Sequence, residues 1–244
     1  MLVKSVKLFF ILFAAFFQWA CGLDDLPFLY PVPDSNVTTR MGEVTIRIPD
    51  DNDLTFTHFA IYYKIYISDV LTETPLGMLG TINQTLSQDY NAILPRTDPE
   101  NMQPASHDFF RGRGFFPLEV RGDLHINRVL DSSLFGSNLI ITFPLLGTPT
   151  LTAGGTSYAL YRSEGSGPVR FEARPDRLFR NRPELTDTIS NTINADVAGN
   201  DNVTADARVY TYVAMYIVSV GFDPVNQTSI FSTATLVNVF QLPG

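Results

Sequence analysis

Apolar and polar residues alternate along much of this chain, with the two-residue period of a β-strand that buries one face. The clearest short example is residues 43–48 (EVTIRI), in which every second residue is apolar. Residues 56–68 are rich in aromatic and β-branched side chains, which favours a long strand. One face of this strand is wholly apolar, and we expect it to face the core: Phe59, Ile61, Tyr63, Ile65 and Ile67.

The C-terminal part of the chain shows the same period. Residues 208–220 carry apolar side chains on both faces, which predicts a central strand that is covered on two sides. A turn is expected to begin at residues 221–224 (GFDP), because proline, glycine and aspartate favour turns. Residues 229–240 are then predicted to form the last strand.

The middle of the chain, about residues 71–205, is also mostly β in pattern. Proline and glycine separate four candidate strands, at residues 76–82, 118–125, 138–143 and 157–162. No amphipathic helix of three turns is evident, although residues 177–187 or 188–197 have room for a short one. The pattern therefore predicts an all-β domain over residues 42–244 that includes a long, mostly-β insertion.

Two segments resemble strands of a known fold family. Residues 62–66 (YYKIY) resemble the third strand, and residues 210–219 (YTYVAMYIVS) the sixth strand, of an immunoglobulin-like or fibronectin type III-like sandwich. The resemblance covers less than a third of the chain. It implies two packed antiparallel sheets, here enlarged by the insertion at about residues 71–205.

The first residues have the layout of an export signal. Lys4 and Lys7 precede an unbroken apolar run at residues 8–17, which is too short to span a bilayer, and small Ala20 then precedes Cys21. The pair Ala20-Cys21 resembles the end of a bacterial lipobox, which implies that residues 1–20 are removed and that Cys21 carries lipid. The chain has one cysteine, so the alternatives for Cys21 are a free thiol or a bond to another molecule.

The residues after Cys21 are expected to form a Pro-rich tether, residues 21–41, between the lipid and the domain. The leader and the following sequence CGLDDLPFLYPVP are similar to lipoproteins of spirochaetes. That resemblance implies a lipid-anchored protein of the cell envelope, held to the membrane through its N-terminal lipid. Gly22 stands where aspartate retains lipoproteins in the inner membrane of enteric bacteria, which favours the outer membrane.

The charge balance argues against two kinds of partner. Without residues 1–20, two of the 17 basic residues are lost and all 25 acidic residues remain, so the net charge is 15 − 25 = −10. Such a surface argues against binding nucleic acid and against electrostatic docking on anionic lipid. Lys64 is the one lysine that remains.

No motif indicates catalysis or a metal. The three histidines are far apart in sequence, and His58 is interpreted as a hydrogen-bonded residue of the long strand. The aspartates at residues 50–53 and at 196, 201 and 206 lack the spacing of a calcium loop and are interpreted as solvated turns. No nucleophile elbow is present. We therefore expect no cofactor, no metal and a structural or binding role, with a secreted β-rich enzyme acting on carbohydrate as the alternative.

Two segments are candidates for recognition. Phe110, Arg111, Arg113 and Phe115 combine aromatic and guanidinium groups as binding hot spots do, while the alternative is that the aromatic rings fill the core. The tripeptide Arg121-Gly122-Asp123 is one that host integrins read, and it predicts a host-facing adhesin unless it arose by chance in a strand or turn. The partner is then an unidentified envelope protein or a host ligand.

Overall fold

The computed structural model describes residues 29–40, 42–72, 74–94, 105–120, 129–144, 148–164, 167–170, 197–198 and 210–242. Its strands are β1 Val37–Arg40, β2 Glu43–Arg47, β3 Phe56–Ser68, β4 Phe116–Pro117, β5 Glu119–Val120, β6 Asn138–Thr142, β7 Thr150–Ala153, β8 Thr156–Glu164, β9 Gly167–Arg170, β10 Val197–Ala198, β11 Tyr210–Asp223, β12 Thr228–Phe231 and β13 Thr235–Leu242. Its helices are α2 Leu79–Ile82, α3 Gln84–Ile93 and α4 His107–Arg111, with 3₁₀ turns η1 Asp34–Asn36, η2 Pro75–Gly77 and η5 Ser132–Leu134.

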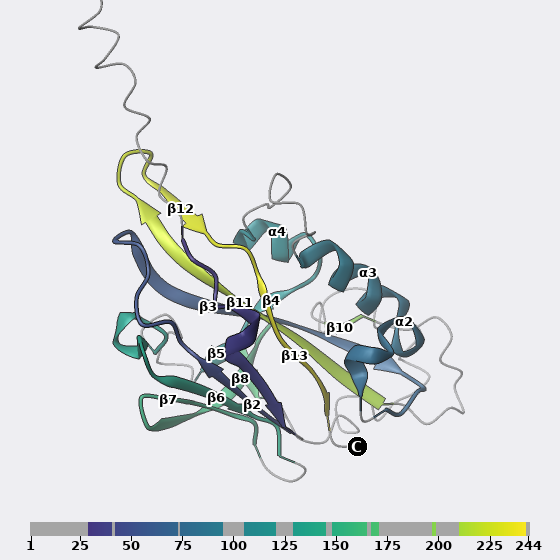
Figure 1. Ribbon diagram of the computed structural model, residues 1–244. Helices are drawn as coiled ribbons and strands as arrows, with labels where there is room; N and C mark the ends of the chain where they lie inside the picture. The colour runs from purple at the N-terminus through teal and green to yellow at the C-terminus, as the bar shows by residue number, and fades with distance from the viewer. Residues whose placement is uncertain are drawn as a thin grey trace, which may run out of the picture.

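The strands form two sheets that pack face to face (Figure 1). One has the order β1-β2-β6-β7-β8-β5, with β9 also paired to β8. The other has the order β10-β3-β11-β12, with β13 also paired to β11 and β4 to β3. The predicted all-β sandwich is therefore confirmed. The order β3-β11-β13 is also the order of the third, sixth and seventh strands in an immunoglobulin-like sandwich.

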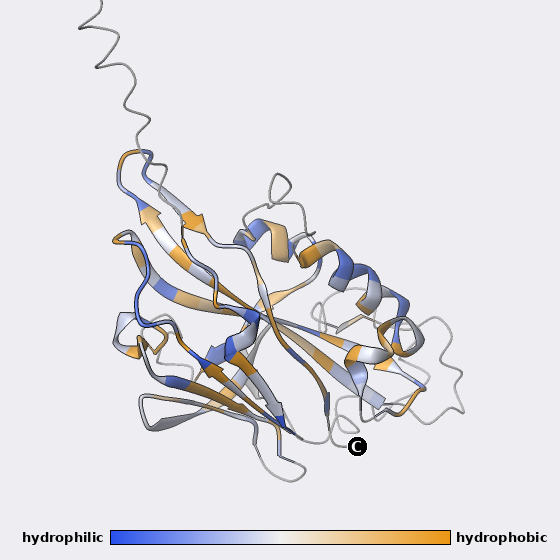
Figure 2. Ribbon diagram, viewed as in Figure 1, coloured by the Kyte–Doolittle hydropathy of each residue, from blue (hydrophilic) through white to orange (hydrophobic). Residues whose placement is uncertain are grey.

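Strands β3 and β11 pair along their whole length. Their antiparallel register runs from Tyr210 opposite Ser68 to Gly221 opposite Phe56. The expected core face of β3 is confirmed, because its residues are buried together with side chains of the other sheet. The residues that β3 and β11 place between the two sheets are Phe59, Ile61, Tyr63, Ile65, Ile67, Val213, Met215 and Ile217. Figure 2 shows apolar residues repeated along both strands.

The opposite face of β3 is buried as well, which the sequence reasoning did not predict. Helices α2, α3 and α4 cover the outer face of the six-stranded sheet (Figure 1). Between the helices and this sheet lies a second apolar cluster, which includes Tyr62, Tyr66, Leu79, Ile82, Leu86, Ile93, Phe110, Tyr212 and Tyr216. The described part of the fold therefore has three layers, and the six-stranded sheet, with β3 and β11 at its centre, is the middle one.

The predicted strand at residues 76–82 is wrong, because this segment forms η2 and α2. Helix α3 begins directly after Asn83, whose side-chain oxygen accepts the N–H of Leu86 at 3.2 Å. The amide of Asn83 also donates to the carbonyl of Ile67 at 3.0 Å and so ties the helix to β3. The buried residues Leu79, Ile82, Leu86 and Ile93 recur at helical spacing, and this signal was missed.

Other predictions in the insertion have mixed outcomes. The predicted strands at 138–143 and 157–162 are confirmed as β6 and β8. Only β5 is seen within 118–125, because residues 121–128 lie outside the described residues. Of the two candidate short helices, residues 177–196 are also outside them, and Val197 belongs to β10. The predicted last strand is divided into β12 and β13. The turn begins three residues later than predicted, because β11 continues to Asp223.

The end of the predicted tether belongs to the folded domain. Leu29 and Val32 are buried, and β1 pairs with β2 along its whole length. Thr235 donates a hydrogen bond to the carbonyl of Val32. Residues 29–40 are thus part of the sandwich rather than a free linker.

Candidate functional site

The structure describes one of the three sites that the sequence predicts. Cys21 and the tripeptide Arg121-Gly122-Asp123 lie outside the described residues. Residues 105–120 are described and contain the candidate recognition segment. Its helix α4 begins after Ser106, whose hydroxyl accepts the N–H of Phe109 at 3.2 Å.

The structure contradicts the part of the recognition hypothesis that requires exposed aromatic rings. Phe110 and Phe115 are both buried. Phe110 stacks on Tyr62 with ring centroids 4.1 Å apart, and Phe115 meets Tyr216 edge-on at 5.5 Å. These rings fill the layer between α4 and the six-stranded sheet, because burial of a phenylalanine contributes about 1.5–3 kcal/mol.

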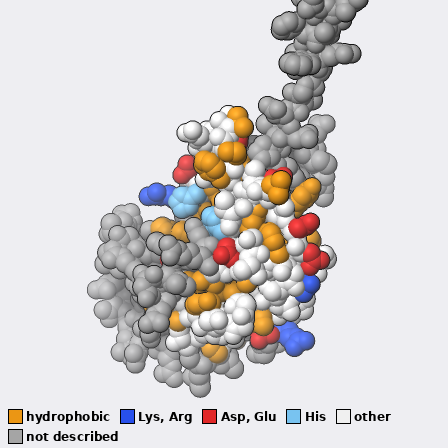
Figure 3. Space-filling view, turned by 90° about the vertical axis from the view of Figure 1, so that its left-hand side faces the viewer, with side chains coloured by type: hydrophobic (Ala, Val, Ile, Leu, Met, Phe, Trp, Pro, Cys, Tyr) orange, Lys and Arg blue, Asp and Glu red, His pale blue; other side chains and the backbone are white. Residues whose placement is uncertain are grey.

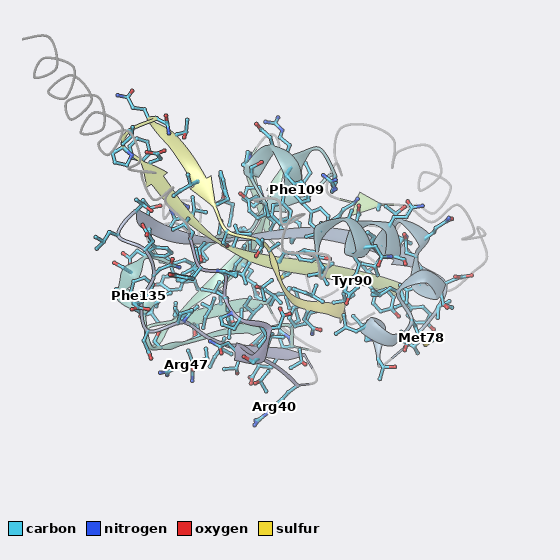
Figure 4. All side chains as sticks on the ribbon, turned by 45° about the horizontal axis from the view of Figure 1, so that its top comes forward. Arg40, Arg47, Met78, Tyr90, Phe109 and Phe135 are labelled. Carbon is cyan, nitrogen blue, oxygen red and sulfur yellow. The ribbon has the colours of Figure 1, made fainter. Side chains whose placement is uncertain are left out.

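The two arginines of the same segment differ. Arg111 is exposed at the end of α4. Arg113 is half-buried, and its guanidinium lies 3.9 Å from the centre of the Phe109 ring and donates to the Phe109 carbonyl at 3.1 Å. Arg113 therefore closes the α4 turn, and Arg111 is the one member of the predicted set that is fully available to a partner. Figure 4 shows Phe109 on α4, on the same side of the sheet as Tyr90 of α3.

A buried ion pair links this segment to α3. The ammonium of Lys64, on β3, donates to a carboxylate oxygen of Asp89 at 2.7 Å and to the carbonyl of Arg113 at 2.7 Å. The hydroxyl of Tyr66 donates to the same oxygen of Asp89 at 2.7 Å. Both charged side chains are almost fully buried, so their mutual attraction has to offset the hydration that each loses.

The tyrosines around this pair are held in their neutral form. Burial, followed by the negative charge of Asp89, raises the pKa of Tyr66 well above its ordinary value of 10.0. Burial also raises the pKa of Tyr62 to about 12 and that of Tyr216 further. Among the described residues the buried hydroxyl of Tyr216 has no hydrogen-bond partner. These groups keep their protons at neutral pH and serve the packing of the layer.

Two of the residues considered for metal binding, Asp53 and His58, make other contacts, whereas His125 and the aspartates at 196, 201 and 206 lie outside the described residues. A carboxylate oxygen of Asp53 accepts from the N–H and the hydroxyl of Thr55, and these bonds lower the Asp53 pKa. His58 is half-buried beside the Thr57 hydroxyl, and burial lowers its pKa. Within the described part of the chain, no three His, Cys, Asp or Glu residues lie close enough to hold a metal ion.

The sequence reasoning missed a clamp that holds the chain where it enters the domain from Cys21. The side chain of Asn52 accepts from the N–H of Tyr30 and donates to the Tyr30 carbonyl, both at 3.0 Å. The hydroxyl of Ser219 donates to that carbonyl at 2.7 Å and receives a bond from Asn52 at 3.2 Å. Three segments that are distant in sequence therefore meet at Tyr30.

Comparisons with protein-family models, with curated proteins and with solved structures find no significant match to this chain. Among the described residues, no helix is both long and apolar enough to cross a membrane. The function is therefore inferred from the chemistry of the chain itself.

Proposed function

We propose that this chain is a lipid-anchored protein of a bacterial cell envelope, placed at the outer membrane, with a structural or binding role. The single observation that carries the proposal is the leader that ends at Cys21, a short distance before the clamped Tyr30. Residues 22–28 allow at most about 30 Å between Cys21 and Leu29. A lipid on Cys21 would thus hold one defined end of the domain close to the membrane.

The chemistry of an acylated cysteine suits this role. Each buried methylene contributes about 0.8 kcal/mol, and one acyl chain alone binds only marginally, whereas two or three give stable anchoring. The acidic balance of the domain offers no electrostatic attraction to anionic lipid. The acyl chains therefore carry the attachment.

The hydrogen bonds and burial of the ionisable groups support a non-catalytic role. Lys64, Asp89 and Tyr66 bond to one another inside a packed layer. A catalytic acid or base needs access to a substrate and a pKa near the working pH. The raised tyrosine pKa values move away from that range, which favours a stabilising function for this cluster.

Metabolic labelling with radioactive palmitate tests the anchor. The wild-type protein is expected to take up label and to sediment with outer membranes in a density gradient. Cys21→Ala removes the single cysteine, so this variant is expected to be unlabelled and to leave the membrane fraction. An unlabelled wild type, or equal labelling of Cys21→Ala, would overturn the proposal.

A further inference from the structure

Exposed apolar side chains gather at the end of the domain where the chain arrives from Cys21. Leu54 is fully exposed, Val225 is 82% exposed, and Phe222 is 46% exposed. Tyr30, beside them in the clamp, is 58% exposed. Apolar side chains are visible at the upper end of the described surface in Figure 3. A group of large exposed apolar residues at one end of a domain marks a contact surface.

These residues come from separate segments that pack together. The N–H of Phe222 donates to the Thr55 carbonyl at 2.9 Å. Gly221 lies so close to Thr55 and Leu29 that an added Cβ would stand 2.6 Å from the Thr55 carbonyl oxygen. We call residues 51–55, residues 221–227 and Tyr30 the N-terminal tip. Gly221 and Phe222 contact the loop that carries Leu54, and residues 223–227 continue from them into the turn between β11 and β12, which Figure 1 shows at one end of the domain.

Side-chain caps hold both loops of the N-terminal tip in shape. Asp223 accepts from the N–H groups of Val225 and Asn226, at 2.8 and 3.2 Å, and from the Asn226 amide at 2.7 Å. Asp53 caps the loop that carries Leu54 in the same way, through Thr55. The apolar side chains therefore project from a preformed surface, so little conformational entropy is lost when they are buried.

The position of Cys21 identifies what covers this surface. The link of at most about 30 Å keeps the N-terminal tip near any membrane that holds the lipid. Among the described residues, the other large apolar side chains that are exposed are those of Leu71, Leu76 and Met78, which follow the far end of β3, a strand about 40 Å long. Figure 4 shows Met78 at the end opposite the β11–β12 hairpin. The short link thus favours the N-terminal tip over the far end.

We infer that the N-terminal tip inserts Leu54, Phe222 and Val225 into the interfacial region of the bilayer that carries the Cys21 lipid. This inference rests on the proposed function. The neighbouring Asp50 and Asp51 are exposed and acidic, so the contact is apolar and needs no anionic lipid. The insertion would fix the orientation of the sandwich relative to the membrane.

Tryptophan fluorescence tests this orientation directly. The one tryptophan of the chain is Trp19, in the leader, so the processed protein has none. Leu54→Trp and Val225→Trp each place a single tryptophan on the N-terminal tip, and Leu76→Trp is the matched control at the far end. Each acylated protein is reconstituted in phosphatidylcholine vesicles with and without lipid brominated on its acyl chains.

We expect emission from Leu54→Trp and Val225→Trp to shift to shorter wavelength and to lose intensity with brominated lipid. Leu76→Trp should show neither change, and addition of anionic lipid should not increase the quenching at the tip. If the protein is anchored but tip and control emissions are equally unquenched, the inference is overturned while the anchor stands. A blue shift without quenching would also overturn it, because a protein surface would then cover the tip.

The two proposals fail separately. Palmitate labelling and sedimentation report the anchor in the same preparations. Quenching at the tip in protein that carries no label, after vesicles are added, would support the inference and overturn the anchor. Absence of both signals would overturn both.

Discussion

The side chain of Asn52 satisfies both backbone groups of Tyr30, accepting from its N–H and donating to its carbonyl, each at 3.0 Å. This contact joins the first described residues of the chain to the loop before β3. Asn52 also bonds to Ser219 on β11, so the entry of the chain is fastened to the middle layer of the fold.

The first prediction concerns this clamp. Asn52→Ala removes its bonds to Tyr30 and Ser219, and we expect the free energy of unfolding to fall by about 1–3 kcal/mol. Proteolysis near Tyr30 should accelerate, because the segment opens locally before the domain unfolds. Asn138→Ala, at an exposed position on β6, is the control and should change neither quantity. Equal effects of the two variants in urea unfolding and limited proteolysis would show that the bonds of Asn52 to Tyr30 and Ser219 do not stabilise the domain.

The second prediction concerns the buried ion pair. Asp89→Ala leaves the Lys64 ammonium buried without its partner, and we expect a loss of about 3–5 kcal/mol in urea unfolding. The double variant Lys64→Met with Asp89→Leu should lose less than Asp89→Ala, because no buried charge remains. Asp50→Ala breaks the exposed pair with Arg47 and should cost about 1 kcal/mol or less. A similar loss of unfolding free energy for Asp89→Ala and Asp50→Ala would contradict the burial of the Lys64–Asp89 pair.

The third prediction separates two tyrosines of one cluster. Tyr66 donates a hydrogen bond to the carboxylate of Asp89, so Tyr66→Phe should lower stability by about 1.5–3 kcal/mol. The Tyr216 hydroxyl is buried without a partner among the described residues, so Tyr216→Phe should be neutral or raise stability by about 1 kcal/mol. Thermal unfolding of both variants tests the order, and a larger loss for Tyr216→Phe would refute it.

The fourth prediction is a pH dependence from His58. Burial lowers the pKa of His58 below the unfolded value of 6.5. The unfolded chain therefore binds the proton more readily, and the contribution of neutral His58 to stability is present above pH 6.5 and lost as the pH falls below it. Urea unfolding over this range should show a smaller decline for His58→Gln than for the wild type. Parallel curves for the two proteins would mean that His58 does not carry this dependence.

How far the sequence predicts the fold is clear from β3 and β11. Their aromatic and β-branched residues specify strands locally, and the two-residue period identified the core face of β3 correctly. The sequence did not predict that the outer face of β3 is also buried, because an apolar residue does not reveal whether a sheet or a helix covers it. Leu79, Ile82, Leu86 and Ile93 carry the helical spacing of the covering helices, but a short apolar segment such as 76–82 fits a strand as well as a helix.

For the candidate sites, too, the sequence predicts the composition, and the structure shows the contacts. The Phe110–Phe115 segment has the composition of a binding loop, yet only packing against Tyr62 and Tyr216 shows that its rings are buried. Lys64 is conspicuous in the sequence as the one lysine after residue 20, but its partner Asp89 lies on α3, a helix that the sequence pattern did not predict. The clamp at Tyr30 joins three segments that are distant in sequence, and no local sequence pattern predicts such a contact.

The amino-acid sequence by itself determined the apolar pattern of the first 20 residues, the single cysteine, the acidic balance and the β character of the chain, because each is a property of composition or of neighbouring residues. Only the tertiary structure decided that β3 is covered on both faces, which charges are paired, and which apolar residues stay exposed near Tyr30. Those outcomes depend on contacts between residues far apart in the chain, such as Tyr30 with Ser219, whose energies exist only once the sheets and helices are packed.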